Sequence, residues 1–204
     1  AGAPGYDTPL YGSGYVVTYN HDGTGRQFLQ PTGADMNSLA FGEGLWVTDD
    51  YLYVTAQYSN LLGAVYRYEL NSGYPDQASQ VTFTRPNFPA QGGELLSPIT
   101  VGTKVITGSQ LYDYNSLSNS GVGRVWDLDG SNDFIIAPSD VVADGRFGKS
   151  VAQNSTKLAF GANKNAGGGE AGYVYLYDTD GSNEIIITPS TSSGRFATSI
   201  FLID

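Results

Sequence analysis

The sequence predicts an all-β protein, and three observations lead to this fold class. Short apolar runs rich in β-branched and aromatic residues are separated throughout the chain by polar or glycine-rich turns. Within one run, Val174 and Leu176 alternate with tyrosines, which is the period of two that a strand imposes. Asp180-Gly181 lies between two such runs and predicts a tight hairpin, because glycine accepts a positive φ without steric cost. Short antiparallel strands are therefore expected.

These strands form a repeated unit. Residues 147–190 hold four apolar runs, which predict one four-stranded antiparallel sheet. The hairpin at 126–139, WDLDGSNDFIIAPS, is a near copy of the one at 177–190, YDTDGSNEIIITPS. The residue after the last aromatic of the third run recurs at intervals of 49, 58 and 51 residues, at Asn20, Glu69, Asp127 and Asp178.

The repeat spacing predicts four units arranged in a ring. Three are continuous in sequence, at 41–86, 94–139 and 147–190, and the fourth combines 194–204 with 1–32. In this fourth unit the C-terminal segment is expected to supply the first strand, and residues 1–5, AGAPG, the second. Such a pairing of the terminal segments would remove an unpaired sheet edge, which proteins avoid. Radial repetition of four-stranded sheets is the β-propeller. We therefore expect a single domain over 1–204 with sixteen strands in four blades and essentially no helix.

Composition excludes several classes of partner. The net charge of −10 argues against nucleic acid and anionic membranes, because their binding depends on Lys and Arg. The sequence has no Cys, so disulfides and thiolate metal sites are excluded. It has no run of 18 apolar residues, so insertion into a membrane by a helix is not expected.

Several motifs resemble the FG-GAP repeat, the blade motif of integrin α-subunit propellers and of many bacterial and phage proteins. Phe41-Gly42 and Phe147-Gly148 match its FG element. The run at 1–4, AGAP, matches its GAP element, and Gly161-Ala162-Asn163 matches it loosely. The resemblance covers nearly the whole chain, and its style is similar to repeats of marine bacteria and their phages. It implies a propeller of FG-GAP blades.

The resemblance also raises the question of calcium, which integrin-type repeats hold in loops with several Asp at alternating positions. The corresponding loops here contain only one acidic pair, Asp49-Asp50, so calcium bound in that manner is not expected. Two further acidic sets resemble calcium loops but lie between strands, where Asp-Gly is ordinary turn chemistry. They are Asp127, Asp129 and Asp133, and Asp178, Asp180 and Glu184. We expect turns and no cofactor, with a weak calcium site as the alternative.

Catalytic patterns are poorly supported by the sequence. His21 is the only histidine, and it lies beside Asp22-Gly23 in an expected surface turn, so a Ser-His-Asp triad would depend on an exposed residue. A pair of carboxylates for glycoside hydrolysis cannot be recognised from sequence alone. Most tyrosines of the third strands are expected to pack between blades.

The leading interpretation is a non-enzymatic binding or assembly module on a virion appendage or in an extracellular adhesion protein. Its partners would be other proteins of an assembly or a cell-surface or glycan receptor, with a homo-oligomer left open. A carbohydrate-binding lectin is the alternative, and a glycosidase-type enzyme is third.

The expected binding surface consists of the loops between the second and third strands of the blades. Four-fold repetition would bring these loops to one face, and they carry aromatic residues beside amides and carboxylates, a mix favoured in binding loops. The candidate residues are Tyr6, Asp7, Tyr58, Asn60, Tyr112, Asp113, Tyr114, Asn115, Asn163 and Asn165.

Overall fold

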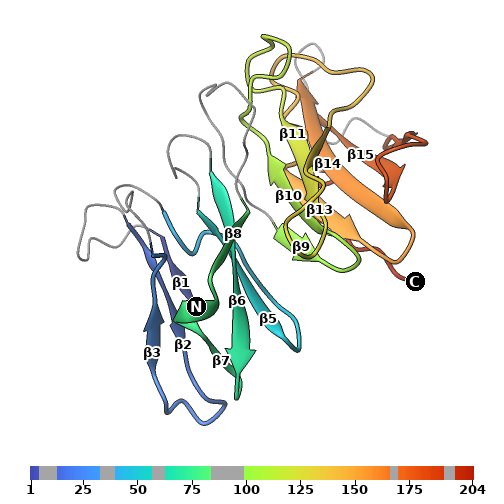
Figure 1. Cartoon of the computed structure of the whole chain (residues 1–204). Helices are drawn as coiled ribbons and strands as arrows, with labels where there is room; N and C mark the ends of the chain where they lie inside the picture. The colour runs from blue at the N-terminus through green and yellow to red at the C-terminus, as the bar shows by residue number, and fades with distance from the viewer. Residues whose placement is uncertain (5–12, 33–39, 57–62, 84–98, 166–169, 191–195) are drawn as a thin grey trace. The chain divides into compact units, whose positions relative to one another are not determined.

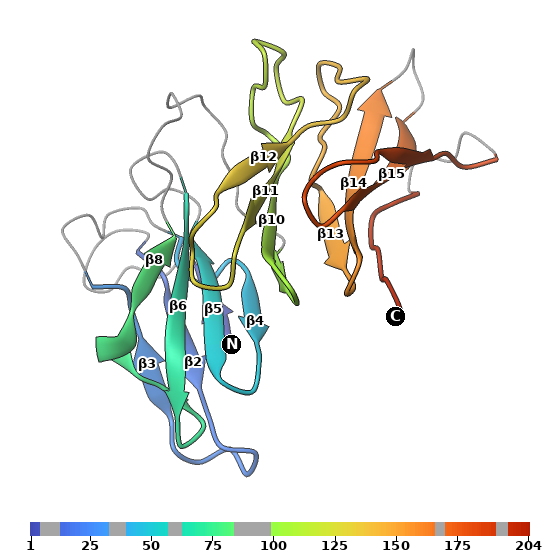
Figure 2. The ribbon, with the colours of Figure 1, turned by 45° about the vertical axis from the view of Figure 1, so that its right-hand side comes forward.

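A computed structural model describes residues 1–4, 13–32, 40–56, 63–83, 99–165, 170–190 and 196–204. Its strands and termini are shown in Figures 1 and 2. The chain divides into two compact units, residues 1–90 and 91–204, and each is considered by itself. The prediction of an all-β protein is confirmed, since the chain forms four antiparallel sheets. In the described residues the one helix is a 3₁₀ turn, Gln77–Ser79.

The first unit contains two sheets. The N-terminal sheet has the order β1-β2-β3, and the second sheet has the order β4-β5-β6, with β8 pairing to β6 and the short β7 extending β6 as a hairpin. The run expected to supply a second strand near the start of the chain is indeed β1, which pairs with β2. The strands are β1 (Gly2–Ala3), β2 (Tyr15–Thr18), β3 (Gln27–Leu29), β4 (Leu45–Val47), β5 (Tyr51–Ala56), β6 (Ala64–Asn71), β7 (Tyr74–Pro75) and β8 (Val81–Phe83).

The second unit contains the third and fourth sheets, each of four strands in sequence order. Their strands lie within residues 99–136 and 150–187, and residues 94–98 lie outside the described residues. The third sheet is β9 (Ile99–Val101), β10 (Val105–Ser109), β11 (Val122–Trp126) and β12 (Phe134–Ile136). The fourth sheet is β13 (Ser150–Gln153), β14 (Lys157–Asn165), β15 (Glu170–Asp178) and β16 (Ile185–Ile187).

Within each unit the FG element of one sheet lies directly on glycines of the preceding sheet. A Cβ built on Gly108 of β10 would lie 1.7 Å from the carbonyl oxygen of Gly148, and one on Gly121 would lie 2.2 Å from that of Phe147. Gly2 and Gly14 have the same relation to Gly42 and Phe41, at 2.0 and 2.3 Å. Backbone approach this close requires the absence of a side chain. The FG motif therefore marks the contact between consecutive sheets.

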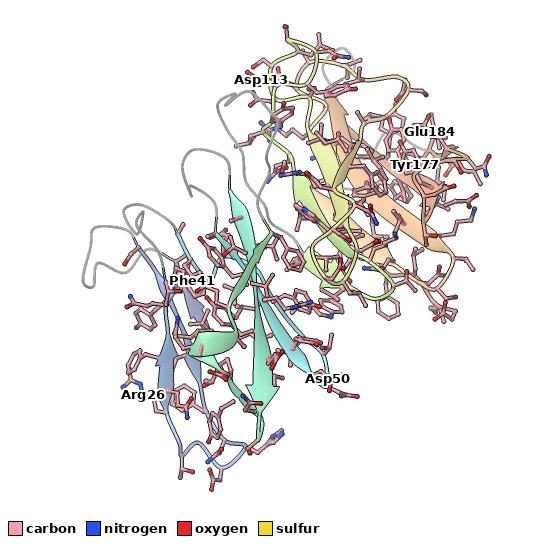
Figure 3. The ribbon with its side chains drawn as sticks, viewed as in Figure 1. Arg26, Phe41, Asp50, Asp113, Tyr177 and Glu184 are labelled. Carbon is pink, nitrogen blue, oxygen red and sulfur yellow. The ribbon has the colours of Figure 1, made fainter. Side chains whose placement is uncertain are left out.

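The core of each unit is formed where its two sheets face each other. In the first unit, Phe41 packs edge-on against Tyr66 and Tyr68. In the second unit, Phe147 has the same relation to Tyr175 and Tyr177. These four tyrosines are buried, which confirms for them the expected packing role. Figure 3 labels Phe41 and Tyr177 in the two units.

The C-terminal segment, Phe196–Asp204, departs from the prediction of a strand, because it forms no strand of its own. It instead packs against one face of the fourth sheet, where Ala197 joins a buried cluster with Ala152, Ala159 and Val174. Ser150 donates a hydrogen bond to the carbonyl of Ala197 (2.7 Å). The segment is therefore anchored to one face of β13–β15. Within the described residues it pairs with no strand.

None of the helices in the described residues has the length and apolar character needed to cross a bilayer.

Candidate binding loops

The structure describes only some of the predicted site residues. Tyr6, Asp7, Tyr58 and Asn60 lie outside the described residues. Asn165 ends β14, but its side chain is not described. The remaining five belong to the second unit: Tyr112, Asp113, Tyr114 and Asn115 in the loop between β10 and β11, and Asn163 on β14.

The loop between β10 and β11, residues 110–121 and here the Tyr112 loop, is folded on itself by hydrogen bonds. Asp113 Oδ1 accepts the backbone N–H of Asn119 at 2.7 Å. Ser120 Oγ accepts the N–H of Tyr114 and donates to the carbonyl of Tyr112. Because these bonds join both arms of the loop, its conformation is fixed by its own polar side chains.

Burial separates the predicted residues of this loop into two kinds. Tyr112 is buried, so its ring packs beneath the loop. Asp113 and Tyr114 are half-buried, and Asn115 is exposed. The side chains available to a partner are therefore those at the tip of the loop, residues 114–116. Asp113, labelled in Figure 3, also holds the loop through its hydrogen bond to Asn119.

A second loop, residues 137–149 between β12 and β13 and here the Asp144 loop, lies alongside the Tyr112 loop. The N–H groups of Asp144 and Arg146 donate to the carbonyls of Ser118 and Asn119 at 2.7 and 2.9 Å. The Asn119 side chain returns a hydrogen bond to Asp144 Oδ1 at 3.0 Å. The two loops therefore form one surface, which we call the paired loops.

Backbone strain is concentrated in the paired loops. Ten non-glycine residues of the described chain have a positive φ, and half of them lie here: Asn115, Ser116, Asn119, Asp144 and Arg146. Asn and Asp tolerate this region through local hydrogen bonds, whereas a long side chain such as that of Arg146 does so less readily. Strained backbone persists where the surroundings over-determine it, and it clusters at functional sites.

Sequence reasoning did not identify Asn119, Asp144 or Arg146. Asp144-Gly145 is a turn signal that could have indicated a loop, but nothing in the sequence places that loop beside residues 118–120. The pairing arises because Arg146 precedes the FG element, and Phe147 N–H is bonded to the carbonyl of Ser120.

Asn163, at the end of β14, lies next to the paired loops. Its backbone N–H donates to the carbonyl of Gly145 at 3.0 Å, within the Asp144 loop. Its side chain is buried, and Oδ1 has no hydrogen-bond partner in the part of the chain that the structure describes. The predicted Asn163 and Tyr112–Asn115 therefore do converge, although Asn163 lies beneath the surface.

In the acidic sets that resemble calcium loops, the carboxylates bind hydrogen-bond donors and cations of the protein itself. Asp129 Oδ1 accepts both the N–H and the hydroxyl of Ser131, and Asp180 has the same relation to Ser182. The serine hydroxyl hydrogen bonds hold the pKa of each carboxyl below its usual value. The equivalent first residues, Asp127 and Asp178, pair with Lys104 and Lys157, and Asp133 pairs with Arg124. These sets thus have the chemistry of hairpin turns.

No group of three or more His, Cys, Asp or Glu that could hold a metal ion occurs among residues the structure describes. His21 lies in an exposed turn, as the sequence predicts. A histidine-dependent nucleophile would therefore have to be built on an exposed turn.

Glu184 joins the third and fourth sheets through hydrogen bonds. It accepts hydrogen bonds from the N–H of Ser139 at 3.0 Å and from the hydroxyl of Tyr177 at 2.5 Å. Partial burial by itself would raise the pKa of Glu184, but the hydrogen bonds from Ser139 and Tyr177 outweigh it and leave the pKa below its usual value. Glu184 thus links the end of β12 to β15.

No protein-family model and no curated protein matches the chain. The all-β architecture with several antiparallel sheets is therefore established by the structure, and the FG-GAP resemblance rests on the motifs.

Proposed function

We propose that the chain is a non-enzymatic binding or assembly module built from FG-GAP-type blades. In this proposal the four sheets are blades of a four-bladed β-propeller. The C-terminal segment supplies the first strand of the blade whose other strands are β1, β2 and β3. The partner is another protein of an assembly or a cell-surface receptor, on a virion or outside the cell.

The repeated contact between sheets supports the blade interpretation. Gly123 of β11 and Val16 of β2 occupy equivalent positions. Gly123 pairs with Gly108 and Val16 pairs with Gly2, and each of these two partner glycines contacts the FG element of the next sheet. A Cβ on Gly123 would lie 2.2 Å from the ring of Phe160, whereas the first unit has Val54 at the position of Phe160. The contact between sheets thus pairs a glycine with a phenylalanine in the second unit, and two valines in the first unit. Such exchange of volume is expected where one packing arrangement is repeated.

The strain in the paired loops is the observation that carries the binding role. A loop needs no left-handed Asn, Ser, Asp and Arg residues to connect two strands, because glycine serves that purpose at lower cost. Here Asn119, Asp144 and Arg146 are held by hydrogen bonds between the loops, which fixes the base of the tip that carries Asn115 and Ser116. Rigid polar and aromatic loops bind with a small loss of conformational entropy.

We also propose that the chain is not an enzyme, because of the way its carboxylates are hydrogen-bonded. The acidic side chains of the two hairpin turns are bonded to Lys, Ser and Asn, and Glu184 is bonded to Ser139 and Tyr177. Carboxylates engaged in this way hold turns and sheets together.

The test is fractionation of the organism that encodes the chain, combined with assays on the purified protein. The proposal expects the protein in a particle or cell-surface fraction and no turnover of a panel of nitrophenyl glycosides. Saturable binding on a glycan array that free sugar competes would favour the lectin instead. Glycoside turnover, or a protein found only as a free intracellular species, would contradict the proposal.

A further inference from the structure

The face of the fourth sheet beneath the C-terminal segment is shaped to receive the backbone of a Phe-Gly element. A Cβ on Gly172 would lie 1.7 Å from the carbonyl oxygen of Phe196, and one on Gly161 would lie 2.6 Å from that of Ala197. These contacts repeat those that the FG element of the fourth sheet makes with the glycines of the third sheet. We call this face, which carries Gly161, Asn163 and Gly172 on β14 and β15, the acceptor face.

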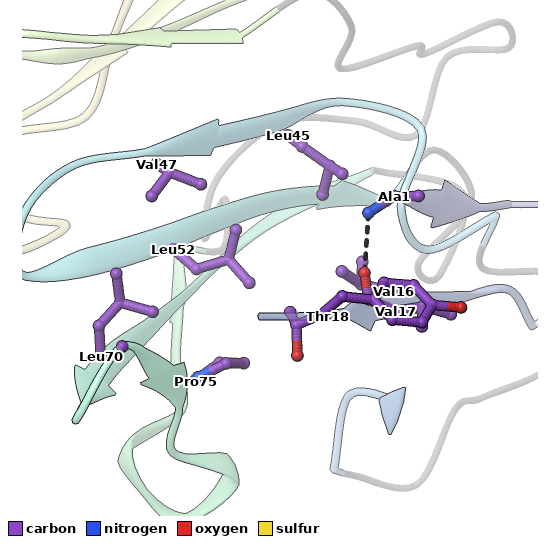
Figure 4. A pocket seen from close by; sticks show the side chains of 11 residues that line it. Ala1, Val16, Val17, Thr18, Leu45, Val47, Leu52, Leu70 and Pro75 are labelled. Atoms are coloured by element: carbon purple, nitrogen blue, oxygen red, sulfur yellow. Dashed lines mark hydrogen bonds between the residues drawn. The ribbon is translucent and has the colours of Figure 1, made fainter. Parts of the chain in front are cut away.

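The first unit shows that the Phe-Gly residues define such a contact more than the apolar side chains that follow them. Phe41-Gly42 lies on glycines of the N-terminal sheet in the same way. Beside it an apolar groove of about 360 Å³ remains open between the two sheets, with Val16, Leu45 and Leu52 among its lining residues (Figure 4). The contact therefore persists where the flanking side chains do not fill the space.

The residue at the glycine position of the C-terminal segment is strained. Gly42 and Gly148 have φ values of 98° and 84° at this position, which glycine adopts freely. The C-terminal segment has Ala197 there with a φ of 65°, which is unfavourable for a residue with a Cβ. The strands that follow Gly42 and Gly148 also pair with a second strand, whereas the C-terminal segment pairs with none among the described residues. The segment is therefore a poorer occupant than the Phe-Gly elements elsewhere in the chain.

A buried hydrogen-bond acceptor on the acceptor face also lacks a donor. Asn163 is 4% exposed, and its Oδ1 has no hydrogen-bond partner in the described part of the chain. Asn163 pairs with Gly172 across the two strands, so its side chain lies on the same face, near the Phe196 carbonyl. A buried polar atom without a partner is unfavourable. An occupant that brings a donor to this end of the face would therefore bind better than the C-terminal segment does.

The far end of the C-terminal segment is held at the exposed turn between β13 and β14. Asn154 Nδ2 donates to the carbonyl of Ile203 at 3.0 Å, and the N–H of Ser155 donates to Asp204 Oδ1 at 2.8 Å. Phe201 and Ile203 are 84% and 79% exposed. Release of this end breaks hydrogen bonds that water can replace, and it breaks no strand pairing within the described residues.

We propose that the acceptor face is a binding site for a partner segment that begins with Phe-Gly, and that such a partner displaces the C-terminal segment. This inference rests on the proposed assembly function, because it takes the partner to be another protein of the assembly. Glycine at the second position removes the strain that Ala197 carries, and a donor beside the phenylalanine satisfies Asn163 Oδ1. All residues of the site belong to the second unit.

Two synthetic peptides test the exchange on the full chain. One is the peptide of residues 196–204 carrying Ala197→Gly, here the Phe-Gly peptide, and the control is the same peptide with Ala197 unchanged. The tethered C-terminal segment competes at an effective concentration of about 1 mM, so calorimetry should give the control peptide a Kd of about 1 mM. Because the Phe-Gly peptide is free of the strain, it should bind about fivefold tighter, with a Kd of about 0.2 mM.

Two variants of the full chain assign the binding to the acceptor face. Ala197→Gly in the chain relieves the strain of its own segment, so the Phe-Gly peptide should bind this variant about fivefold more weakly than it binds the wild type. The second variant is Ser155→Cys with Asp204→Cys. Ser155 Oγ lies 2.7 Å from Asp204 Oδ1, so oxidation should tie the segment to the turn. Peptide binding should disappear in the oxidised form and return on reduction, which makes the protein its own control for folding.

Hydrogen exchange of residues 196–204 should rise when the Phe-Gly peptide binds the reduced protein, because the segment is displaced. Absence of binding, equal affinity of the two peptides, or binding that persists in the oxidised protein would overturn the proposal. Any of these results would leave the proposed assembly function standing, because that function is tested separately by fractionation and by the glycoside assays.

Discussion

At the residue scale, the account depends on glycines that allow backbones to touch. Gly2, Gly108 and Gly161 occupy the same position in three second strands, and each lies under the first residues of a following segment. The sequence reveals the FG element that follows, but it does not reveal which glycine receives it. That information depends on the packing of one sheet on another, which sequence periodicity does not encode.

Gly108→Ala should destabilise the second unit by about 3 kcal/mol, because the new methyl group would displace the backbone of Gly148. Urea denaturation measures the change. Gly23→Ala is the control: it has φ +80 with nothing within 4 Å, so it should cost only about 1 kcal/mol. Equal losses for the two variants would mean that the sheet contact is not tight.

Glu184 should contribute to acid sensitivity. Its pKa is lower in the folded state than in the unfolded chain, so its stabilising contribution is present above the unfolded pKa and is lost as pH falls through the folded pKa. We expect the wild-type melting temperature to fall as pH decreases below about 4.5, the usual value for Glu. Glu184→Gln should reduce the size of that fall. A Gln variant with an unchanged pH profile would show that Glu184 does not link the two sheets.

At the element scale, strands and hairpins were largely predictable from sequence, whereas the loops were not. Alternating apolar runs and Asp-Gly turns located β10 to β16, because period and turn chemistry are local properties. The pairing of the Tyr112 and Asp144 loops depends on hydrogen bonds between residues 25 apart, such as Asn119 to Asp144. The C-terminal segment was predicted as a strand because its apolar pattern fits one, but a strand requires a partner edge.

Two tyrosines of the Tyr112 loop should respond differently to substitution. Tyr112→Ala removes a buried ring and should cost about 3 kcal/mol in urea denaturation. Tyr114→Ser removes a half-buried ring and should cost less than about 1 kcal/mol.

Once a partner is identified, Tyr114→Ser and Asn115→Gly should weaken its binding in calorimetry with only a small change in the melting temperature. Unimpaired binding by both variants would place the interaction surface elsewhere.

At the scale of the whole molecule, both units repeat one contact between an FG element and the glycines of the preceding sheet. The sequence predicted the repeat and its circular spacing. It did not predict whether residues 196–204 complete the N-terminal sheet within a chain or between chains, because the same contacts serve both arrangements.

Deletion of residues 196–204 should lower the stability of the second unit by a few kcal/mol, because Ile200 and Leu202 cover apolar side chains of the fourth sheet. Differential scanning calorimetry measures the loss. Phe201→Asp should have little effect on the same transition in the monomer, since its side chain is exposed. An unchanged transition in the deletion variant would contradict the anchoring of the segment.

The most direct test of blade completion is a disulfide between Ala1→Cys and Ile200→Cys, since the chain has no other cysteine. Position 200 corresponds to Ile99, which pairs with Thr107, and Thr107 corresponds to Ala1. The two introduced sulfurs should therefore come within bonding reach. Mass spectrometry after mild oxidation should show this bond, forming much faster than one between Ala1→Cys and Val142→Cys. Failure to form the bond, or equal rates for both pairs, would contradict the account.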